Sequence, residues 1–407
     1  MTTATTAPIT TPSVEMREFQ TDVMRMNMGP QHPSTHGVLR IKLELDGEKV
    51  LKAEPMIGYL HRGIEKLAET KRYNQVIPLL DRMDYLAAMC FNLGFVLAVE
   101  KLFDVQLPPR GQYIRVIMCE IARLASHCIW LGAHAMDVGA ITVFLYTFRE
   151  RELAYDIFEH ICGQRMTVSY MRVGGLMNDM DDECVTMIKK YIETMKQRIE
   201  EYNRLLTKNP IWMDRTIGIG HMTAQECMDM NITGPCARGC GIDWDLRRDQ
   251  PYSAYDQFEF EVPVYQAGDV YARYLQRIDE MRQSVRILEQ AINRLPDGPF
   301  NVDNFKIILP PKELVKRDME AMIHHFKLTI DGCKPPKGEI YMPTESPRGE
   351  LGFYIQSDGS GKPYRMKVRN PTMINLQSLG RMCQGHFLAD VVAVIGTLDV
   401  VLGEVDK

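Results

Sequence analysis

Residues 179–206 read DMDDECVTMIKKYIETMKQRIEEYNRLL, and this stretch decides the fold class. Its apolar side chains recur every three or four residues, as one buried face of a helix requires. They are Val185, Ile188, Ile192, Met195, Ile199, Tyr202 and Leu205. The acids at 179–183 stand where the positive end of the helix dipole favours negative charge. The stretch therefore predicts a long amphipathic helix with one face against a core.

The helical period extends from this stretch over residues 73–206, and it returns in a second long helix expected at 269–293. A last apolar helix is expected at 376–395. No internal repeat divides the chain. Helices of this length and number predict one central helix bundle.

Strand-like alternation is confined to the two ends of the chain. Apolar residues alternate with polar ones over 39–45, and an Asp46-Gly47 turn follows, which is typical of a β-hairpin. Residues 338–370 predict two further strands, joined by a Gly-rich turn at 358–361. The expected fold class is mainly α with small β elements, an α+β protein built around a helix bundle.

The composition is that of an ordinary globular protein. Among 407 residues, 45% are hydrophobic and 25% are charged, which excludes a disordered or fibrous chain. The net charge of −5 gives no general affinity for nucleic acid or anionic lipid. Ten irregularly spaced cysteines are too few for a disulfide scaffold, so we expect reduced thiols.

Neither the start of the chain nor its interior predicts membrane insertion. Residues 1–12 are Thr-rich and uncharged, without the apolar segment of an export signal or the arginines of a transit peptide. The longest apolar run, 86–99, contains Asn92 and is too short to span a bilayer. We expect a tail at the start, no transmembrane segment, and membrane association only through a partner.

The cysteines and histidines do not form a recognisable metal site. Zinc and iron–sulfur sites usually contain Cys-x-x-Cys pairs, whereas Cys236 and Cys240 are separated by three residues. His127 and His134 share a helical face, but a spacing of seven residues places them about 10 Å apart, too far for one ion. Phosphate-binding glycine loops and a nucleophile elbow are also missing. The sequence therefore predicts no redox metal held by this chain.

Four polar clusters stand out against this background. They are GPQHPSTHG at 29–37, HRGIEK at 61–66, DRMDY at 81–85 and DVGA at 137–140. Each has an ordinary structural interpretation, because Gly/Pro loops are usually turns and charged pairs at helix starts are usually caps or surface ion pairs. No cluster alone therefore assigns a function.

Taken together, the clusters resemble one family. From about residue 19 to 407 the chain is similar to the 49-kDa subunit, or D subunit, of NADH-quinone oxidoreductase, respiratory complex I. Further motifs support the resemblance: GCGIDWDLR at 239–247, QPY at 250–252, MRQS at 281–284, SDGS at 357–360, LADVV at 388–392, IGT at 395–397 and GEVDK at 403–407. The combination is far more specific than any single motif.

The resemblance implies a fold like that of the NiFe-hydrogenase large subunit, a helix bundle with β segments from both termini. We expect four parts along the chain. They are a disordered tail (1–18), an N-terminal β region with a quinone-site loop (19–62), a central helix bundle (63–335), and a C-terminal β hairpin and helix packed on the bundle (336–407).

The resemblance also implies roles for four residues of the clusters. By position, His36 reaches the quinone head group, Tyr85 faces it, and Asp137 couples to His36. Arg62 lies beside a 4Fe-4S cluster that a neighbouring subunit carries. We therefore expect His36, Tyr85 and Asp137 to act in catalysis, and His36, Tyr85 and Arg62 to line the quinone and the cluster, with no metal ligand in this chain.

The implied function is quinone reduction within a proton-translocating NADH:quinone oxidoreductase, with electrons from NADH arriving through FMN and iron–sulfur centres. Expected partners are the subunit with the terminal 4Fe-4S cluster, the neighbouring peripheral-arm subunits, the quinone-channel membrane subunit and the quinone itself, but no nucleic acid. The expected location is the cytoplasmic side of a bacterial inner membrane, as a peripheral protein. The quinone is ubiquinone or menaquinone.

The chemistry of quinone reduction suits these residue types. Two-electron reduction places negative charge on both carbonyl oxygens, which must then be stabilised and protonated. A tyrosine hydroxyl and an imidazolium can each donate to one oxygen and each can give up a proton. Histidine titrates near neutral pH, and a nearby carboxylate favours its charged form. Arg62 cannot deprotonate, and would hold positive potential near the cluster.

The chain departs from the family at two positions near the cluster. Some members have a histidine where Thr167 stands in RMTVSY at 165–170, and Val173 replaces a common proline. A neutral hydroxyl at 167 cannot bind a proton when the cluster is reduced. We therefore expect the cluster potential to depend weakly on pH.

Three classes of function remain open. The preferred one is the quinone-site subunit. A hydrogenase-like large subunit would need two Cys-x-x-Cys pairs to hold nickel and iron, and the chain has none, so this alternative requires that its NiFe site has been lost. A non-catalytic scaffold subunit would make His36 and Tyr85 dispensable.

Overall fold

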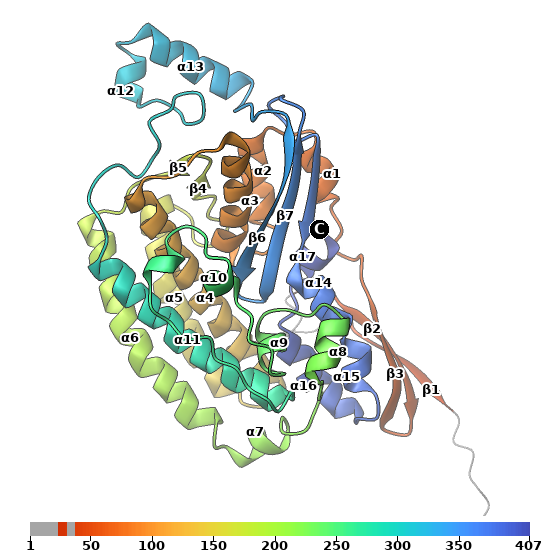
Figure 1. Ribbon diagram of the computed structural model, residues 1–407. Helices are drawn as coiled ribbons and strands as arrows, with labels where there is room; N and C mark the ends of the chain where they lie inside the picture. The colour runs from red at the N-terminus through yellow and green to blue at the C-terminus, as the bar shows by residue number, and fades with distance from the viewer. Residues whose placement is uncertain (1–22, 31–36) are drawn as a thin grey trace, which may run out of the picture.

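The structure is a computed structural model that describes residues 23–30 and 37–407 (Figure 1). Four long helices pack against one another and form the central bundle. They are α4 (Pro109–Asp137), α5 (Ile141–Cys162), α6 (Asp182–Leu206) and α11 (Val270–Asn293). The mainly α class with small sheets is confirmed, and α6 and α11 match the two long helices that the sequence predicts.

The shorter elements surround this bundle. Before and between the long helices lie α1 (Ile64–Ala68), α2 (Tyr73–Leu80), α3 (Ala88–Phe103), β4 (Met171–Arg172), β5 (Gly175–Leu176), α7 (Pro210–Asp214), α8 (Ala224–Asp229), α9 (Pro235–Arg238), α10 (Leu246–Asp249) and η2 (Tyr255–Gln257). After α11 come α12 (Lys312–Val315) and α13 (Met319–Ile330).

Local chemistry explains where α6 begins and which face it buries. The Asp181 carboxylate caps the helix by accepting from the Cys184 backbone N–H at 2.8 Å. The predicted stripe is buried in its middle, but Leu206 is buried in place of Leu205, which is 39% exposed. An α-helix has 3.6 residues per turn, so side chains spaced seven residues apart shift slowly around its axis. By the end of this 25-residue helix the face that meets the core has therefore rotated.

Helix α4 is the core helix of the bundle. It packs on α3, α5, α11 and α16, and 94% of its most apolar window is buried inside the molecule. By length and composition it is the one helix among the described residues that could cross a membrane. The buried core helix of a soluble protein can be equally long and apolar. The expectation that no segment crosses a membrane therefore stays a prediction.

The hairpin near the start of the chain is confirmed and belongs to a larger sheet. β2 (Arg40–Asp46) and β3 (Lys49–Met56) pair antiparallel around the Asp46-Gly47 turn. The sequence did not predict β1 (Met24–Met28), which pairs with β2 so that Met26 faces Leu43. In an isolated hairpin the outer backbone groups of each strand are unpaired. β1 pairs with those of β2 and so covers that edge.

The second sheet has three strands where the sequence predicts two. β6 (Gly338–Ser346), β7 (Gly349–Ser357) and β8 (Arg365–Arg369) pair in chain order. The predicted turn at 358–361 joins β7 to β8, and a tighter turn at 347–348 joins β6 to β7. Helix α3 packs against β6 and β7.

The predicted single helix at 376–395 is wrong. The structure has short helices there, α14 (Pro371–Leu376), α15 (Leu379–Cys383) and α16 (Leu388–Leu398), and then α17 (Leu402–Asp406). The chain leaves helical geometry at Gly385 (φ +81°), because its N–H donates to the Val50 carbonyl at 2.8 Å. The Leu388 N–H likewise donates to Glu48, so bonds to the hairpin replace helical ones.

Two hydrophobic cores meet beside the predicted site. The larger core fills the bundle and the space between α3 and the second sheet, and it includes Met83. The smaller core lies between the first sheet and helices α15–α17, and it includes Leu39 and Leu402. The turn that carries Tyr85 follows Met83, so it lies where the two cores adjoin.

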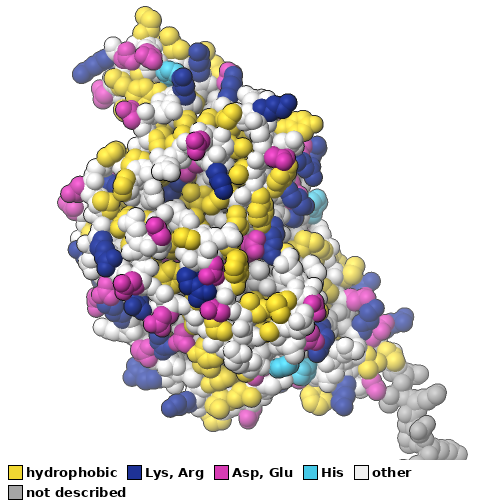
Figure 2. Space-filling model, in the orientation of Figure 1, with side chains coloured by type: hydrophobic (Ala, Val, Ile, Leu, Met, Phe, Trp, Pro, Cys, Tyr) yellow, Lys and Arg dark blue, Asp and Glu magenta, His cyan; other side chains and the backbone are white. Residues whose placement is uncertain are grey.

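Helices α12 and α13 project from the body at the top of the view (Figure 1). Met319 and Phe326 on α13 are 72% and 64% exposed, and hydrophobic side chains gather on this arm in the space-filling view (Figure 2). Lysines and histidines share the arm, so it is amphipathic rather than uniformly apolar.

A buried ionic network ties α4, α11, the α9–α10 segment and β6 together. Its side chains are Glu120, Arg123, Arg238, Asp245, Arg247, Glu280 and Glu345. Arg238 meets Glu345 at 2.8 Å, and Arg247 meets Asp245 at 2.7 Å. Four carboxylates face three guanidinium groups, so full ionisation leaves one excess negative charge. Burial, reinforced by Asp245, raises the pKa of Glu345 to about 7.

This raised pKa predicts a pH-dependent stability. Below the usual value of 4.5 both folded and unfolded chains hold the Glu345 proton, and above about 7 neither does. Between these values only the folded chain holds it, so this group lowers the free energy of unfolding as the pH rises through the window. The Glu345→Gln variant should lose less stability than the wild type between about pH 5 and pH 7.5, measured by urea unfolding of the purified chain.

Glu339 supplies the matched control, because it lies on an exposed part of the same strand. The Glu339→Gln variant should follow the wild-type pH profile. Parallel profiles for wild type and Glu345→Gln would contradict a raised pKa at Glu345.

Candidate functional site

The residues predicted to form the site come from separate parts of the chain. Arg62 precedes α1, Tyr85 lies between α2 and α3, and Asp137 is the last residue of α4. His36 lies outside the described residues, but the next residue, Gly37, is described. The structure therefore bears on the surroundings of Arg62, Tyr85 and Asp137, while the position of His36 stays a prediction.

Tyr85 sits in a turn, 81–87, that buried carboxylates hold in place. Asp84 Oδ1 accepts from the backbone N–H groups of Leu86 at 3.1 Å and Ala87 at 3.2 Å, just before α3 begins. Asp81 accepts from the Asn92 amide at 2.7 Å. A short polar side chain that binds nearby backbone N–H groups fixes such a turn.

One arginine connects this turn to the rest of the molecule. Arg348, fully buried in the β6–β7 turn, pairs with Asp84 at 2.8 Å and with Asp399 at 3.3 Å. It also donates to the Ser126 hydroxyl on α4 at 3.0 Å. Glu404 lies in the same electrostatic cluster, where burial and the Asp84 charge raise its pKa well above the usual range.

The Tyr85 side chain is half-buried between two glycines. A methyl group on Gly37 would lie 3.6 Å from the Tyr85 hydroxyl oxygen, and one on Gly403 would lie 2.9 Å from its ring. Burial, with the Asp84 charge nearby, raises the pKa of Tyr85 to about 12. The phenol is therefore protonated at neutral pH and can donate a hydrogen bond or a proton.

Arg62 is exposed and reaches the same turn. Its guanidinium donates to the backbone carbonyl of Arg82, three residues before Tyr85. Its positive charge also acts on the Tyr85 hydroxyl and opposes the rise in that pKa. The structure thus brings Arg62 close to the Tyr85 turn, while the roles of both residues stay predictions.

Asp137 occupies a partly exposed position at the end of α4. A helix C-terminus carries negative dipole charge, which favours a cation near a carboxylate placed there. The next residues, 138–140, turn through Gly139 (φ +108°) into α5. The coupling between Asp137 and His36 stays a prediction, because it requires the undescribed residue.

The segment that contains Thr167 adjoins the Tyr85 turn. The Ser169 hydroxyl donates to Asp81, and the partly buried Arg172 experiences the Asp81 charge. Thr167 is partly exposed, with its hydroxyl 3.4 Å from the Gln164 side chain. Three arginines, at 62, 82 and 172, therefore lie at or near the turn that holds the carboxylates Asp81 and Asp84.

Sequence reasoning missed the residues that position the site. Arg348, Asp399 and Gly403 lie far from Tyr85 along the chain, and only the fold brings them together. The residues at 37, 82 and 84 stood inside the four polar clusters, but nothing in the sequence separated an anchor from its neighbours.

A cavity of about 390 Å³ lies between the end of α17 and the segment that carries Arg62. Its walls include Ile57, His61, Glu65, Met373 and Asp406. Ile57 and the nearby Tyr59 are exposed, so apolar surface flanks the segment that carries Arg62. Such surface suits a lipid-soluble ligand or a partner chain.

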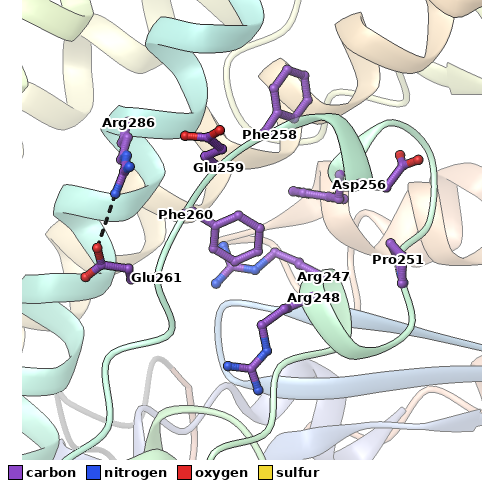
Figure 3. A pocket seen from close by; sticks show the side chains of 10 residues that line it. Arg247, Arg248, Pro251, Asp256, Phe258, Glu259, Phe260, Glu261 and Arg286 are labelled. Atoms are coloured by element: carbon purple, nitrogen blue, oxygen red, sulfur yellow. Dashed lines mark hydrogen bonds and ion pairs between the residues drawn. The ribbon is translucent and has the colours of Figure 1, made fainter.

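A second cavity, of about 450 Å³, is lined by the segment 247–261 and by Arg286 of α11 (Figure 3). Phe260 covers the Arg247 guanidinium at 5.3 Å, and Arg286 pairs with Glu261 at 3.5 Å. Three cations match three acids, so this cavity has no net charge with which to select a charged ligand. The charged lining residues are Arg247, Arg248, Arg286, Asp256, Glu259 and Glu261.

The described residues contain no group of three His, Cys, Asp or Glu side chains arranged to hold a metal ion. All ten cysteines are buried and free of disulfides. His127 and His134 lie in different surroundings: His127 is 3.7 Å from Glu280, whereas His134 packs between Trp130 and Trp212. Burial lowers the pKa of His134 to about 3, so it is neutral.

The Arg348 cluster predicts a large stability effect at Asp84. The Asp84→Asn variant keeps a carbonyl oxygen for the Leu86 and Ala87 N–H groups but removes the charge that faces Arg348. Loss of one partner from a buried ion pair should lower the free energy of unfolding by about 3 kcal/mol. Chemical denaturation of the purified chain measures this change.

The control is Asp104→Asn, at an exposed position with φ 53°, a conformation that Asn tolerates as well as Asp. It should leave the denaturation midpoint unchanged. Equal stability of Asp84→Asn and wild type would show that Arg348 does not depend on Asp84.

Comparison with known proteins adds an independent observation. The family model described as the respiratory-chain NADH dehydrogenase 49-kDa subunit matches residues 137–407. The D subunit of NADH-quinone oxidoreductase from Geotalea uraniireducens is 54% identical over 387 residues, which is 95% of this chain and 99% of the relative. That of Geobacter sulfurreducens is 53% identical over 387 residues, with the same coverage. One of the D subunits of Koribacter versatilis is 51% identical over 396 residues, covering 97% and 99%.

Proposed function

Since this chain belongs to the family of the respiratory-chain NADH dehydrogenase 49-kDa subunit, we propose that it forms one wall of the pocket in which that enzyme reduces quinone. The relatives are D subunits of NADH-quinone oxidoreductase, a bacterial oxidoreductase of several subunits, so the other subunits of this respiratory complex are the partners of this chain. The remaining steps concern which of its residues act on quinone.

The observation that carries the proposal is the position of the Tyr85 hydroxyl. It is protonated, half-buried, held by the Asp84 turn, and close to Gly37, the residue that follows His36. Arg62 adds positive charge on the same side. A hydrogen-bond donor that is fixed in place before the substrate arrives is what a reduced carbonyl oxygen needs.

The chemistry requires two electrons and two protons per quinone. The electrons come from the 4Fe-4S cluster proposed for the neighbouring subunit, and each carbonyl oxygen takes one proton to become a hydroxyl. Tyr85 donates to one oxygen and His36 to the other, and both groups are afterwards reprotonated from water. The Tyr85 donor costs little reorganisation because Asp84 and Arg348 fix its turn before quinone arrives.

Arg62, with Arg82 and Arg172 nearby, favours electron arrival at this face. Fixed positive charge stabilises a reduced cluster next to it, and guanidinium groups keep their charge at every physiological pH. Asp137 would stabilise the charged form of His36 and lose that cationic partner once the proton is given up. We propose this change in charge balance as the step that couples quinone reduction to proton translocation by the membrane subunits.

The location follows from the partners. A chain that shares a quinone pocket with membrane subunits is held at the membrane peripherally, on the cytoplasmic side of a bacterial inner membrane. This placement carries the pocket to the bilayer from which a lipid-soluble quinone enters.

Removal of either proposed donor tests the function. Tyr85→Phe keeps the ring and removes only the hydroxyl, and His36→Ala removes the imidazole. Each should lower NADH:quinone reductase activity by about 10²-fold or more, because a proton donor is worth about that much, while the complex still assembles. Activity is measured on membranes, and the amount of complex is measured on native gels.

Tyr364→Phe is the control, because Tyr364 is 63% exposed and precedes β8, outside the site. It should retain wild-type activity. Wild-type turnover in both Tyr85→Phe and His36→Ala would favour the alternative of a non-catalytic scaffold subunit.

The presence of threonine at position 167 predicts how the potential of the neighbouring cluster depends on pH. The hydroxyl cannot bind a proton as the neighbouring cluster is reduced, so the cluster potential should change little with pH. The Thr167→His variant should show a steeper slope, since imidazole takes up a proton on reduction. Redox titration of the assembled complex at several pH values measures both slopes, and a steep slope in the wild type would overturn the prediction.

A further inference from the structure

Helix α17 touches both halves of the proposed site. Through Asp406, near its end, it contacts the segment 58–61 that leads into Arg62, and through Gly403, near its start, it contacts the turn that carries Tyr85. All five of its residues are buried. The two segments are also linked directly, by the bond from Arg62 to the Arg82 carbonyl.

Asp406 fixes the first of these segments. Its carboxylate oxygens accept from the backbone N–H groups of Gly58 at 2.8 Å and Leu60 at 2.6 Å. Its backbone oxygen lies 2.5 Å from the ring nitrogen Nδ1 of His61. Three bonds from one residue to a four-residue segment leave that segment little freedom, and charge-assisted bonds are the stronger kind.

Gly403 fixes the distance to the second segment. A methyl group there would lie 2.5 Å from the Met83 carbonyl oxygen and 2.9 Å from the Tyr85 ring. Both distances are shorter than van der Waals contact, so the helix backbone can approach the Tyr85 turn this closely only through glycine. Leu402, one residue earlier, lies equally close to Gly37. A methyl group on Gly37 would lie 2.8 Å from the Leu402 Cβ.

Another bond anchors the same helix. Lys407 donates to the Val368 carbonyl on β8 at 2.6 Å and pairs with Glu65 on α1 at 3.2 Å. Glu65 in turn accepts from the Val368 N–H at 2.9 Å. The helix is therefore tied to α1 and β8 as well as to the two site segments, and it can act as a rigid spacer.

We propose that α17 sets the separation between Arg62 and Tyr85, with Asp406 and Gly403 as positioning residues for quinone reduction. Neither residue needs to touch quinone. Asp406 holds the Arg62 segment at one end of the helix, and Gly403 lets the Tyr85 turn rest against the other end. This inference rests on the proposed function, because it assigns roles within the same pocket.

The test uses the assembled complex in membranes and varies each end of α17 separately. Gly403→Ala should displace the Tyr85 turn and lower kcat/KM for a short-chain quinone on the order of tenfold, since misplacement by a fraction of an ångström weakens a catalytic contact. Asp406→Ala, which loses both carboxylate acceptors, should cause a similar loss. Asp406→Asn keeps one acceptor and should recover part of the activity.

Two readouts separate positioning from stability. All values are expressed per assembled complex, and NADH-dependent reduction of a water-soluble acceptor, which bypasses the quinone pocket, should stay at the wild-type rate. Gly338→Ala and Asp318→Asn are matched controls. A methyl group on Gly338 would make only an ordinary van der Waals contact, 3.9 Å from Leu102, and Asp318 accepts a backbone N–H at the start of the distant α13. Both controls should keep wild-type kcat/KM.

The outcomes are distinguishable from those of the proposed function. If Gly403→Ala and Asp406→Asn keep the wild-type kcat/KM while Tyr85→Phe is inactive, the role of α17 is overturned. The proposal that Tyr85 acts on quinone then still stands. An active Tyr85→Phe overturns both. If Asp406→Ala fails to assemble, Asp406→Asn and Gly403→Ala still decide the matter.

Discussion

The buried pairing of Arg348 with Asp84 and Asp399 is the constraint on which the arrangement of the site depends. A guanidinium group buried without partners is very costly, so its carboxylates must stay in place for the fold to hold. One partner lies in the Tyr85 turn, and the other follows α16. Through Ser126 the same arginine also holds α4. Four segments distant in sequence are thereby fixed around one charge, and Tyr85 lies at the edge of this cluster.

The molecule uses buried charge in two places with different consequences. Around Arg348 the carboxylates belong to the segments that surround Tyr85. Burial raises the pKa of the phenol, the Asp84 charge adds to this rise and Arg348 opposes it, so the charges of this cluster reach the proposed chemistry. The larger network of Arg238, Arg247 and Glu280 ties the bundle to the second sheet, away from Tyr85. Desolvation offsets much of the attraction within a buried ion pair, whereas removal of one partner leaves an uncompensated buried charge. Both clusters therefore join their segments only while every partner is present.

The proposed site lies at the meeting of two cores, which explains its composition. The larger core supplies the turn with Tyr85, and the smaller one supplies Leu402 and the strand after Gly37. Helix α17 fills the space between them, and glycine is required at its closest approach to Tyr85. The buried charges at this junction are paired with one another around Arg348, whereas Tyr85 at its edge is only half-buried. Arg62 remains exposed there, where a neighbouring subunit can approach it.

The sequence by itself determined the helix bundle, the first hairpin, the two long helices and the family, because periodicity and local motifs are encoded in neighbouring residues. Its motifs also led to the prediction that Arg62 and Tyr85 belong to the site, and their roles stay a prediction. Only the tertiary structure decided that β1 covers the hairpin edge, that 376–395 breaks into short helices bonded to the hairpin, and that Leu206 replaces Leu205 in the core. The same holds for Arg348, Gly403 and Asp406, whose partners lie hundreds of residues away. Contacts over such separations depend on the packing of the whole chain, which no local pattern contains.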